Sequence, residues 1–96
     1  MKKLGLLNFV KHLLNRFEVF LEEQSAKAEA ELELRKITNS SFAAEMARVA
    51  EAMSERYGTS FLWVMEEAKR RILSGEDQAE VLWYFYKQLL KEGVEK

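Results

Sequence analysis

Side chains that could carry out acid–base, nucleophilic or metal chemistry are few and isolated in this 96-residue chain. His12 is the only histidine and cysteine is absent, so thiolate sites and His/Cys metal clusters are excluded. No serine lies in the G-x-S-x-G turn of a serine nucleophile, and no Glu-x-x-His pair of a di-metal helical bundle occurs. We therefore expect no catalytic residue, no metal site and no cofactor, and we interpret the chain as a non-enzyme.

Charge and composition exclude further classes of protein. The chain has 15 basic and 16 acidic residues, 48% of it is hydrophobic and its net charge is −1, which excludes a disordered polyelectrolyte and a general polyanion coat. The apolar run Leu4–Val10 follows two lysines as in a signal peptide, but Lys11 and His12 end it early. No apolar run approaches the ~18 residues of a membrane span. We expect one domain, 1–96, with no membrane contact and a cytoplasmic location, which suits a chain without cysteine.

Glycines and capping residues divide the second half of the chain into three segments. Gly58, Gly75 and Gly93 each follow a cation-bearing segment, a pattern typical of helix C-termini. The expected N-terminal caps are Ser40–Ser41, Thr59–Ser60, and Asp77 with Glu80 in a D-x-x-E capping box. These signals predict helices near residues 42–57, 60–74 and 78–92.

Apolar residues recur with helical spacing in each of these segments, and no stretch alternates long enough for a strand. The expected core stripes are Phe42, Met46, Val49, Met53 and Tyr57; then Phe61, Met65, Ala68 and Ile72; then Leu82, Phe85 and Leu89. The fold class that follows is all-α: a small helical bundle in which one long N-terminal helix, continuous or broken, precedes three shorter helices.

The first segment, roughly residues 3–37, is too long for a small bundle. As one straight helix it would span ~50 Å, twice the ~25 Å diameter expected of a compact chain of this size. The sequence allows a break near residues 23–26 or a continuous helix whose two halves pack on different surfaces. An a/d heptad line runs along its first half, widened by Leu6, Leu13 and Phe20, and consists of Leu7, Val10, Leu14, Phe17 and Leu21. Ala26, Ala30 and Ile37 point nearly opposite to this line, with Leu34 about 45° further round, and we expect the heptad line to be buried in the core or in an oligomer.

Four consecutive aromatic residues, Trp83 to Tyr86, form the most informative local feature. Four successive helical positions span about 300° of azimuth, so one core face cannot hold all four rings. They either complete a central helix buried on most sides or form a contact patch. Trp83 and Tyr86 share an apolar line with Ala79 and Leu90, whereas Tyr84 lies on neither line and is predicted to be dispensable for folding.

Nucleic-acid binding is the alternative function that the sequence leaves open. The two segments within residues 42–74 have the length of a helix-turn-helix unit. Glu66 and Glu67 near the start of the second segment would repel phosphates, and its cations lie at the wrong end for the usual docking. In this alternative the contacts would be Lys69, Arg70, Arg71, Lys87 and Lys91.

The preferred interpretation is a non-enzymatic helical protein–protein interaction module: an adaptor, accessory subunit or inhibitor. We expect it to bind itself, as a dimer, and an unknown protein partner, and we do not expect it to bind nucleic acid. The predicted interface residues are Leu7, Val10, Leu14, Phe17, Leu21, Leu34, Trp83, Tyr84 and Tyr86.

Overall fold

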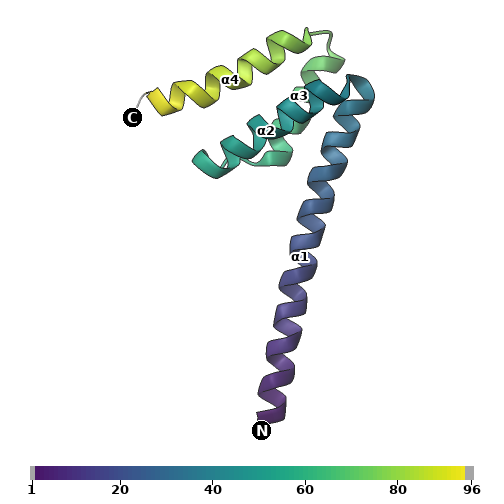
Figure 1. Ribbon diagram of the computed structural model, residues 1–96, viewed down its shortest axis with the longest axis vertical. Helices are drawn as coiled ribbons and strands as arrows, with labels where there is room; N and C mark the ends of the chain where they lie inside the picture. Colours follow the sequence, from purple (N-terminus) through teal and green to yellow (C-terminus); the bar gives the residue numbers. More distant parts are fainter. Residues whose placement is uncertain (1, 95–96) are drawn as a thin grey trace.

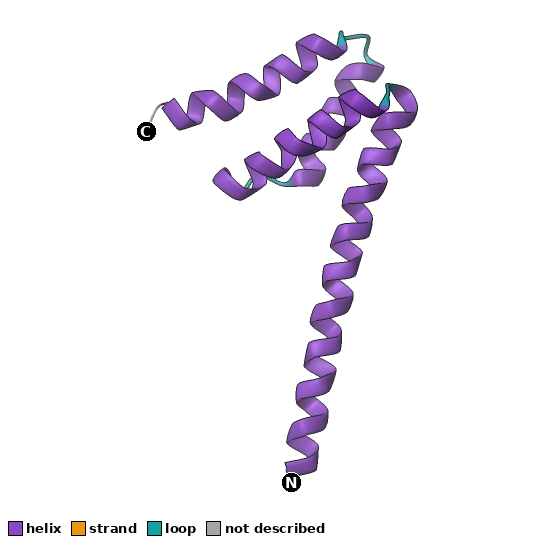
Figure 2. Ribbon diagram, in the orientation of Figure 1, coloured by secondary structure: helices purple, strands orange, loops and turns teal. Residues whose placement is uncertain are grey.

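The computed structural model of the chain consists of four α-helices joined by short loops (Figures 1 and 2). It describes the backbone of residues 2–94 and the side chains of residues 9–91. The helices are α1 (Lys2–Ile37), α2 (Ser40–Tyr57), α3 (Phe61–Leu73) and α4 (Gln78–Val94). No strand occurs within the described backbone, so the predicted all-α fold with one long helix before three shorter ones is confirmed.

Helix α1 is continuous and does not break at residues 23–26. Its 36 residues correspond to about 54 Å at a rise of 1.5 Å per residue, and the molecule is 61 Å long. The radius of gyration is 17.9 Å, well above the ~13 Å of a compact chain of this length. Figure 1 shows the cause: the N-terminal half of α1 extends away from the bundle that its C-terminal half forms with α2, α3 and α4.

The core lies where α2, α3 and α4 meet the C-terminal half of α1. The predicted stripes of the three shorter helices are buried there, with Tyr57, Ile72 and Leu82 only partly covered. Ala43 and Ala50 are completely buried and let α2 approach its neighbours closely. The largest fully buried side chains are Leu34, Met46, Val49, Val64, Met65, Val81 and Phe85. Leu34 is the one buried residue among the described side chains of α1, and Ala30 of the same helix is partly buried against this core.

Two ion pairs accompany the packing of α1 against its neighbours. Lys27 Nζ lies 3.3 Å from Glu51 Oε2 of α2, and Lys69 Nζ of α3 lies 3.1 Å from Glu33 Oε2. All four side chains are partly exposed, and such pairs contribute only about 0–1 kcal/mol each. Burial of Leu34 is therefore the main apolar anchor of α1.

The helix boundaries agree with the predicted signals except at two points. Asn39 caps α2, because its backbone is extended and its side-chain oxygen accepts a hydrogen bond from the Phe42 amide at 2.8 Å. The predicted Ser40–Ser41 cap is wrong, since both serines already belong to the helix. Gly93 does not end α4, which continues to Val94; a glycine within a helix costs about 1 kcal/mol but does not forbid it.

The remaining boundary predictions are confirmed, apart from the Glu80 half of the capping box, which stays a prediction. Ser60 Oγ accepts from the Trp63 amide at 3.2 Å, and Asp77 Oδ2 accepts from the Ala79 amide at 3.0 Å. Gly58 and Gly75 have φ values of 72° and 101°, in the region that favours glycine after a helix end.

We predict that Asn39→Ala lowers the free energy of unfolding by about 0.5–2 kcal/mol, because the Phe42 amide loses its acceptor. Ser40→Ala should change it by no more than a few tenths of a kcal/mol, since surface changes without special contacts are small. Urea denaturation followed by circular dichroism measures both. Asn39→Asp is the matched control, because it keeps the acceptor and loses the amide that donates to Gln78 Oε1. A larger loss for Ser40→Ala than for Asn39→Ala would show that the cap is assigned to the wrong residue.

Candidate protein interaction surface

The projecting half of α1 exposes a continuous stripe of large apolar side chains. We call this stripe the seam; its members are Phe9, Val10, Leu13, Leu14, Phe17, Phe20 and Leu21. Each is between 43% and 61% exposed, and none belongs to the core. The expectation that the core needs these side chains is therefore wrong, because residues of α2, α3 and α4 with Leu34 fill it.

The a and d members of the seam face a different direction from Leu34, which packs on the bundle. Leu14 and Leu34 are twenty residues apart, which places them about 160° apart around the helix at 100° per residue. On a straight helix the other a and d members lie about 100–140° from Leu34, whereas Phe9, Leu13 and Phe20 lie within about 60° of it. Of the two readings left open by the sequence, the continuous helix is correct, and packing of its first half on another surface stays a prediction.

Charged residues border the seam on one side, and apolar residues border it on the other. Lys11 and Glu18 follow Val10 and Phe17 along the chain and occupy the heptad positions called e. Leu13 and Phe20 occupy the opposite flanking positions, called g. The seam is therefore asymmetric across its width, and this asymmetry bears on how a second helix could lie against it.

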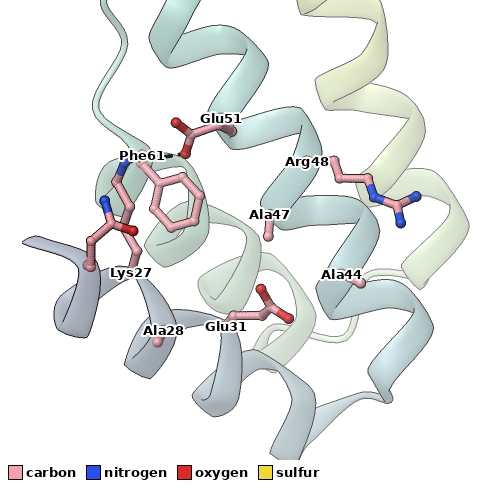
Figure 3. A pocket seen from close by; sticks show the side chains of 9 residues that line it. Lys27, Ala28, Glu31, Ala44, Ala47, Arg48, Glu51 and Phe61 are labelled. Carbon is pink, nitrogen blue, oxygen red and sulfur yellow. Dashed lines mark hydrogen bonds and ion pairs between the residues drawn. The ribbon is translucent and has the colours of Figure 1, made fainter.

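The seam leads into a groove between α1 and α2, shown in Figure 3. Gln24, Ala28 and Glu31 are the next a/d positions after Leu21, and all three line this groove of about 430 Å³. Opposite them, α2 contributes Ala44, Ala47, Arg48 and Glu51. The apolar stripe and the groove thus form one continuous track along α1, apolar in its first half and polar in its second.

One end of the groove is closed by a side-chain cluster that joins three helices. Lys27 of α1 forms its ion pair with Glu51 of α2, and its ammonium lies 5.3 Å from the ring centroid of Phe61 at the start of α3 (Figure 3). A cation over an aromatic ring is attracted to it. The cluster holds the wall of the groove but brings together no group of catalytic geometry.

The sequence-predicted interface residues of α1 have different positions in the structure. Val10, Leu14, Phe17 and Leu21 are exposed members of the seam. Leu34 is 1% exposed within its own chain, so it is a core residue and is not available to a second chain. The Leu7 side chain lies outside the described residues.

The four aromatic side chains of α4 have four different environments. Phe85 is buried in the core with 1% exposure, and Tyr86 is half-buried against α2. Tyr84 packs edge-on against Phe85 with ring centroids 5.1 Å apart, and the Arg71 guanidinium lies 4.0 Å from its ring centroid. Trp83 is 57% exposed, against 37% for Tyr84. Tyr84 is exposed, as expected, but Trp83 is more exposed and α3 supplies Tyr84 with a contact that the α4 sequence does not reveal, so its dispensability for folding stays a prediction.

Tyr86 connects α4 to α2 through its hydroxyl group. The hydroxyl donates to Glu45 Oε2 at 2.9 Å. This hydrogen bond, together with partial burial and the negative charge of Glu45, raises the pKa of Tyr86 above its ordinary value, since each favours the neutral phenol. The predicted contact role of Tyr86 thus competes with a structural one.

The α3 cations proposed for the nucleic-acid alternative are engaged within the chain. Lys69 pairs with Glu33 of α1, and Arg70 pairs with Glu67. Arg71 lies 3.3 Å from carboxylate oxygens of Glu67 and of Glu76. The hydrogen bond from Arg70 lowers the pKa of Glu67 below its ordinary value, although burial opposes this shift. Phosphates would have to compete with carboxylates already in place.

The other two proposed contacts, Lys87 and Lys91, lie on α4. Lys87 is exposed with its ammonium 5.9 Å from the Trp83 ring centroid, and Lys91 is exposed near the end of the described side chains. Because the three α3 cations are held in ion pairs, the five proposed contacts do not form one free basic face.

Metal binding and membrane insertion are two further functions on which the structure bears. Within the described residues, no three side chains of His, Cys, Asp and Glu are grouped as a metal site would require. In the same part of the chain, no helix combines the length and apolar character needed to cross a membrane.

Sequence reasoning missed two kinds of residue. Phe9 extends the seam, and its spacing of four from Leu13 was the available signal. Val64 and Val81 are completely buried, and each lies three or four residues from a predicted core aromatic, Phe61 or Phe85.

We predict that Phe85→Ala lowers the free energy of unfolding by about 3–5 kcal/mol, because it leaves a cavity in the core. Trp83→Ala should change it by less than about 0.5 kcal/mol, since this ring is mostly exposed. Chemical denaturation of both variants provides the comparison. Equal losses would mean that Trp83 contributes to the core as much as Phe85 does.

No protein-family model, curated protein or solved structure matches this chain. No function can therefore be transferred from a related protein. The exposed seam and the groove beyond it are the features from which a function can be argued.

Proposed function

We propose that this chain is a non-enzymatic protein–protein interaction module that binds a helix along the seam of α1. The observation that supports this proposal is the exposure of seven large apolar side chains on one stripe outside the core. Monomeric proteins rarely expose a contiguous apolar patch of more than a few hundred Å², and larger patches mark interaction sites. Adaptor, accessory subunit and inhibitor are the roles that such a module can fill in the cytoplasm, the location expected from the sequence.

The shape of the seam favours a helix as the bound element. Six of its seven members follow heptad a, d and g positions over about three turns, the repeat by which one helix packs on another, and Phe9 lies at a c position beside Leu13. Charged Lys11 and Glu18 limit its width on one side, and His12 occupies the far face of α1. A narrow apolar stripe with polar borders matches the apolar face of an amphipathic partner helix.

The distribution of charge favours a protein partner over nucleic acid. The seam has no cation among its seven members, and the α3 cations have carboxylate partners in the chain. Binding of a polyanion would require free cations at the contact surface. Apolar burial is the interaction that this surface can supply.

We predict that Leu14→Asp weakens assembly at least tenfold, about 1.4 kcal/mol, because it places a charge within the buried seam. The bundle should remain folded, since Leu14 is 56% exposed and lies outside the core. Val19→Asp is the matched control: Val19 is 53% exposed on the same helix but lies about 140° from Leu14. Sedimentation of the purified variants and their co-purification from the native host measure assembly, and circular dichroism measures folding.

Assembly, with itself or with another protein, that is lost in Leu14→Asp and kept in Val19→Asp would support the proposal. Equal assembly in both variants would contradict it, because the seam would then be dispensable. A wild-type chain that remains a lone 11.2 kDa monomer in both measurements would also contradict it.

A further inference from the structure

We infer that the helix bound along the seam is α1 of a second copy of this chain, running antiparallel to the first. The inference rests on the proposed function, since it names the occupant of the same surface. Three features support it: the area of the seam, the different chemistry of the seam's two borders, and the polar groove that follows the seam.

The area of the seam suits a symmetric pair. With about 200 Å² for a fully exposed large apolar side chain, the measured exposures of the seven residues amount to on the order of 700 Å². Each partner of a standard protein interface buries about 800 Å². Two seams placed together therefore supply most of a stable interface before any polar border is counted.

The borders of the seam distinguish an antiparallel from a parallel pair. In a parallel pair each e position lies beside a g position of the other helix, so Glu18 would lie beside an apolar Leu13 of the second copy. In an antiparallel pair e lies beside e and g beside g. Lys11 then meets Glu18 of the second copy, and Leu13 meets Phe20 of the second copy, so opposite charges pair on one border and apolar side chains pair on the other.

The groove beyond the seam opposes a parallel pair independently. Gln24 and Glu31 occupy d positions there. In a parallel pair each d residue faces its own copy, so two Glu31 carboxylates would approach each other in the line of contact, which is unfavourable. In an antiparallel pair Glu31 lies beyond the apolar overlap and stays in contact with water.

The same borders set the register. When Leu14 of one copy lies opposite Phe17 of the other, residue n lies opposite residue 31 − n. Lys11 and Glu18 then lie within two residues of direct opposition, as do Leu13 and Phe20. The two bundles are placed at opposite ends of the paired helices, where neither meets the other.

A spin label at position 29 tests the orientation. The chain has no cysteine, so Glu29→Cys provides one label site per copy. Glu29 is exposed and lies about two turns beyond the seam. In the antiparallel register two labelled positions are 27 residues apart along the axis, about 40 Å at 1.5 Å per residue. In a parallel pair they lie across the helix pair, less than about 25 Å apart.

Pulsed electron paramagnetic resonance at about 100 µM chain, with sedimentation of the same sample, gives three distinct outcomes. A dimer with a distance near 40 Å supports the inference. A dimer with a distance below 25 Å overturns the orientation, and a monomer overturns the second copy as occupant. Neither of these failures by itself contradicts the proposed function, which fails if Leu14→Asp leaves all assembly unchanged or if the wild-type chain neither self-associates nor co-purifies with a partner.

Charge reversal at the border provides the second test. Lys11→Glu or Glu18→Lys should each weaken the dimer about tenfold, because two symmetric attractions become two repulsions. The double variant should restore the wild-type dissociation constant to within about threefold. Arg16→Glu, at a heptad c position outside the a, d, e and g contact positions, is the matched control and should change it by less than about twofold. Failure of the double variant to restore binding would overturn the Lys11–Glu18 pairing.

Discussion

Burial of Leu34 is the interaction on which the arrangement of this molecule depends. It is the one α1 side chain in the core, and it connects the long helix to α2 and α3. The other thirteen core residues come from the three shorter helices. Because the core is complete without the first half of α1, that half is free to extend from the bundle, and its apolar side chains remain at the surface.

The direction of the extended half is set by how the bundle holds the other half. Ion pairs from Lys27 and Lys69 join α1 to the neighbouring helices, but their side chains are partly exposed and contribute little energy. Apolar packing therefore contributes most of the stability of the contact between α1 and the bundle, while the ion pairs favour one rotation of α1 over others. That rotation aligns the polar continuation of the seam with the groove beside α2, while the seam itself lies on the part of α1 that extends beyond the bundle.

The use of charge within the bundle also shapes what the surface can bind. Glu67 accepts from both Arg70 and Arg71, and Arg71 in turn lies over the Tyr84 ring. The cationic residues at the end of α3 are therefore engaged in contacts within the chain. Among the described side chains, those of the seam make no contact of this kind, which is why the proposed function and the further inference both concern α1.

Local signals in the sequence determined the helices and the core of the bundle. Periodic apolar residues such as Phe42, Met46 and Phe85 predicted buried faces, and Ser60, Asp77 and Gly58 predicted boundaries, because helix periodicity and capping act within a few residues. The cap of α2 was misassigned because asparagine and serine are both good caps and stand side by side at 39–41.

Only the tertiary structure decided which apolar residues the core would use. The sequence showed an apolar line on each half of the first segment, but both lines have ordinary helical spacing, so nothing local ranks one above the other. The structure buries Leu34 and leaves Leu14 exposed, and it covers Tyr84 with Arg71 while exposing Trp83. Each of these choices depends on a neighbour more than ten residues away along the chain, and contacts of that kind arise only when whole helices pack together.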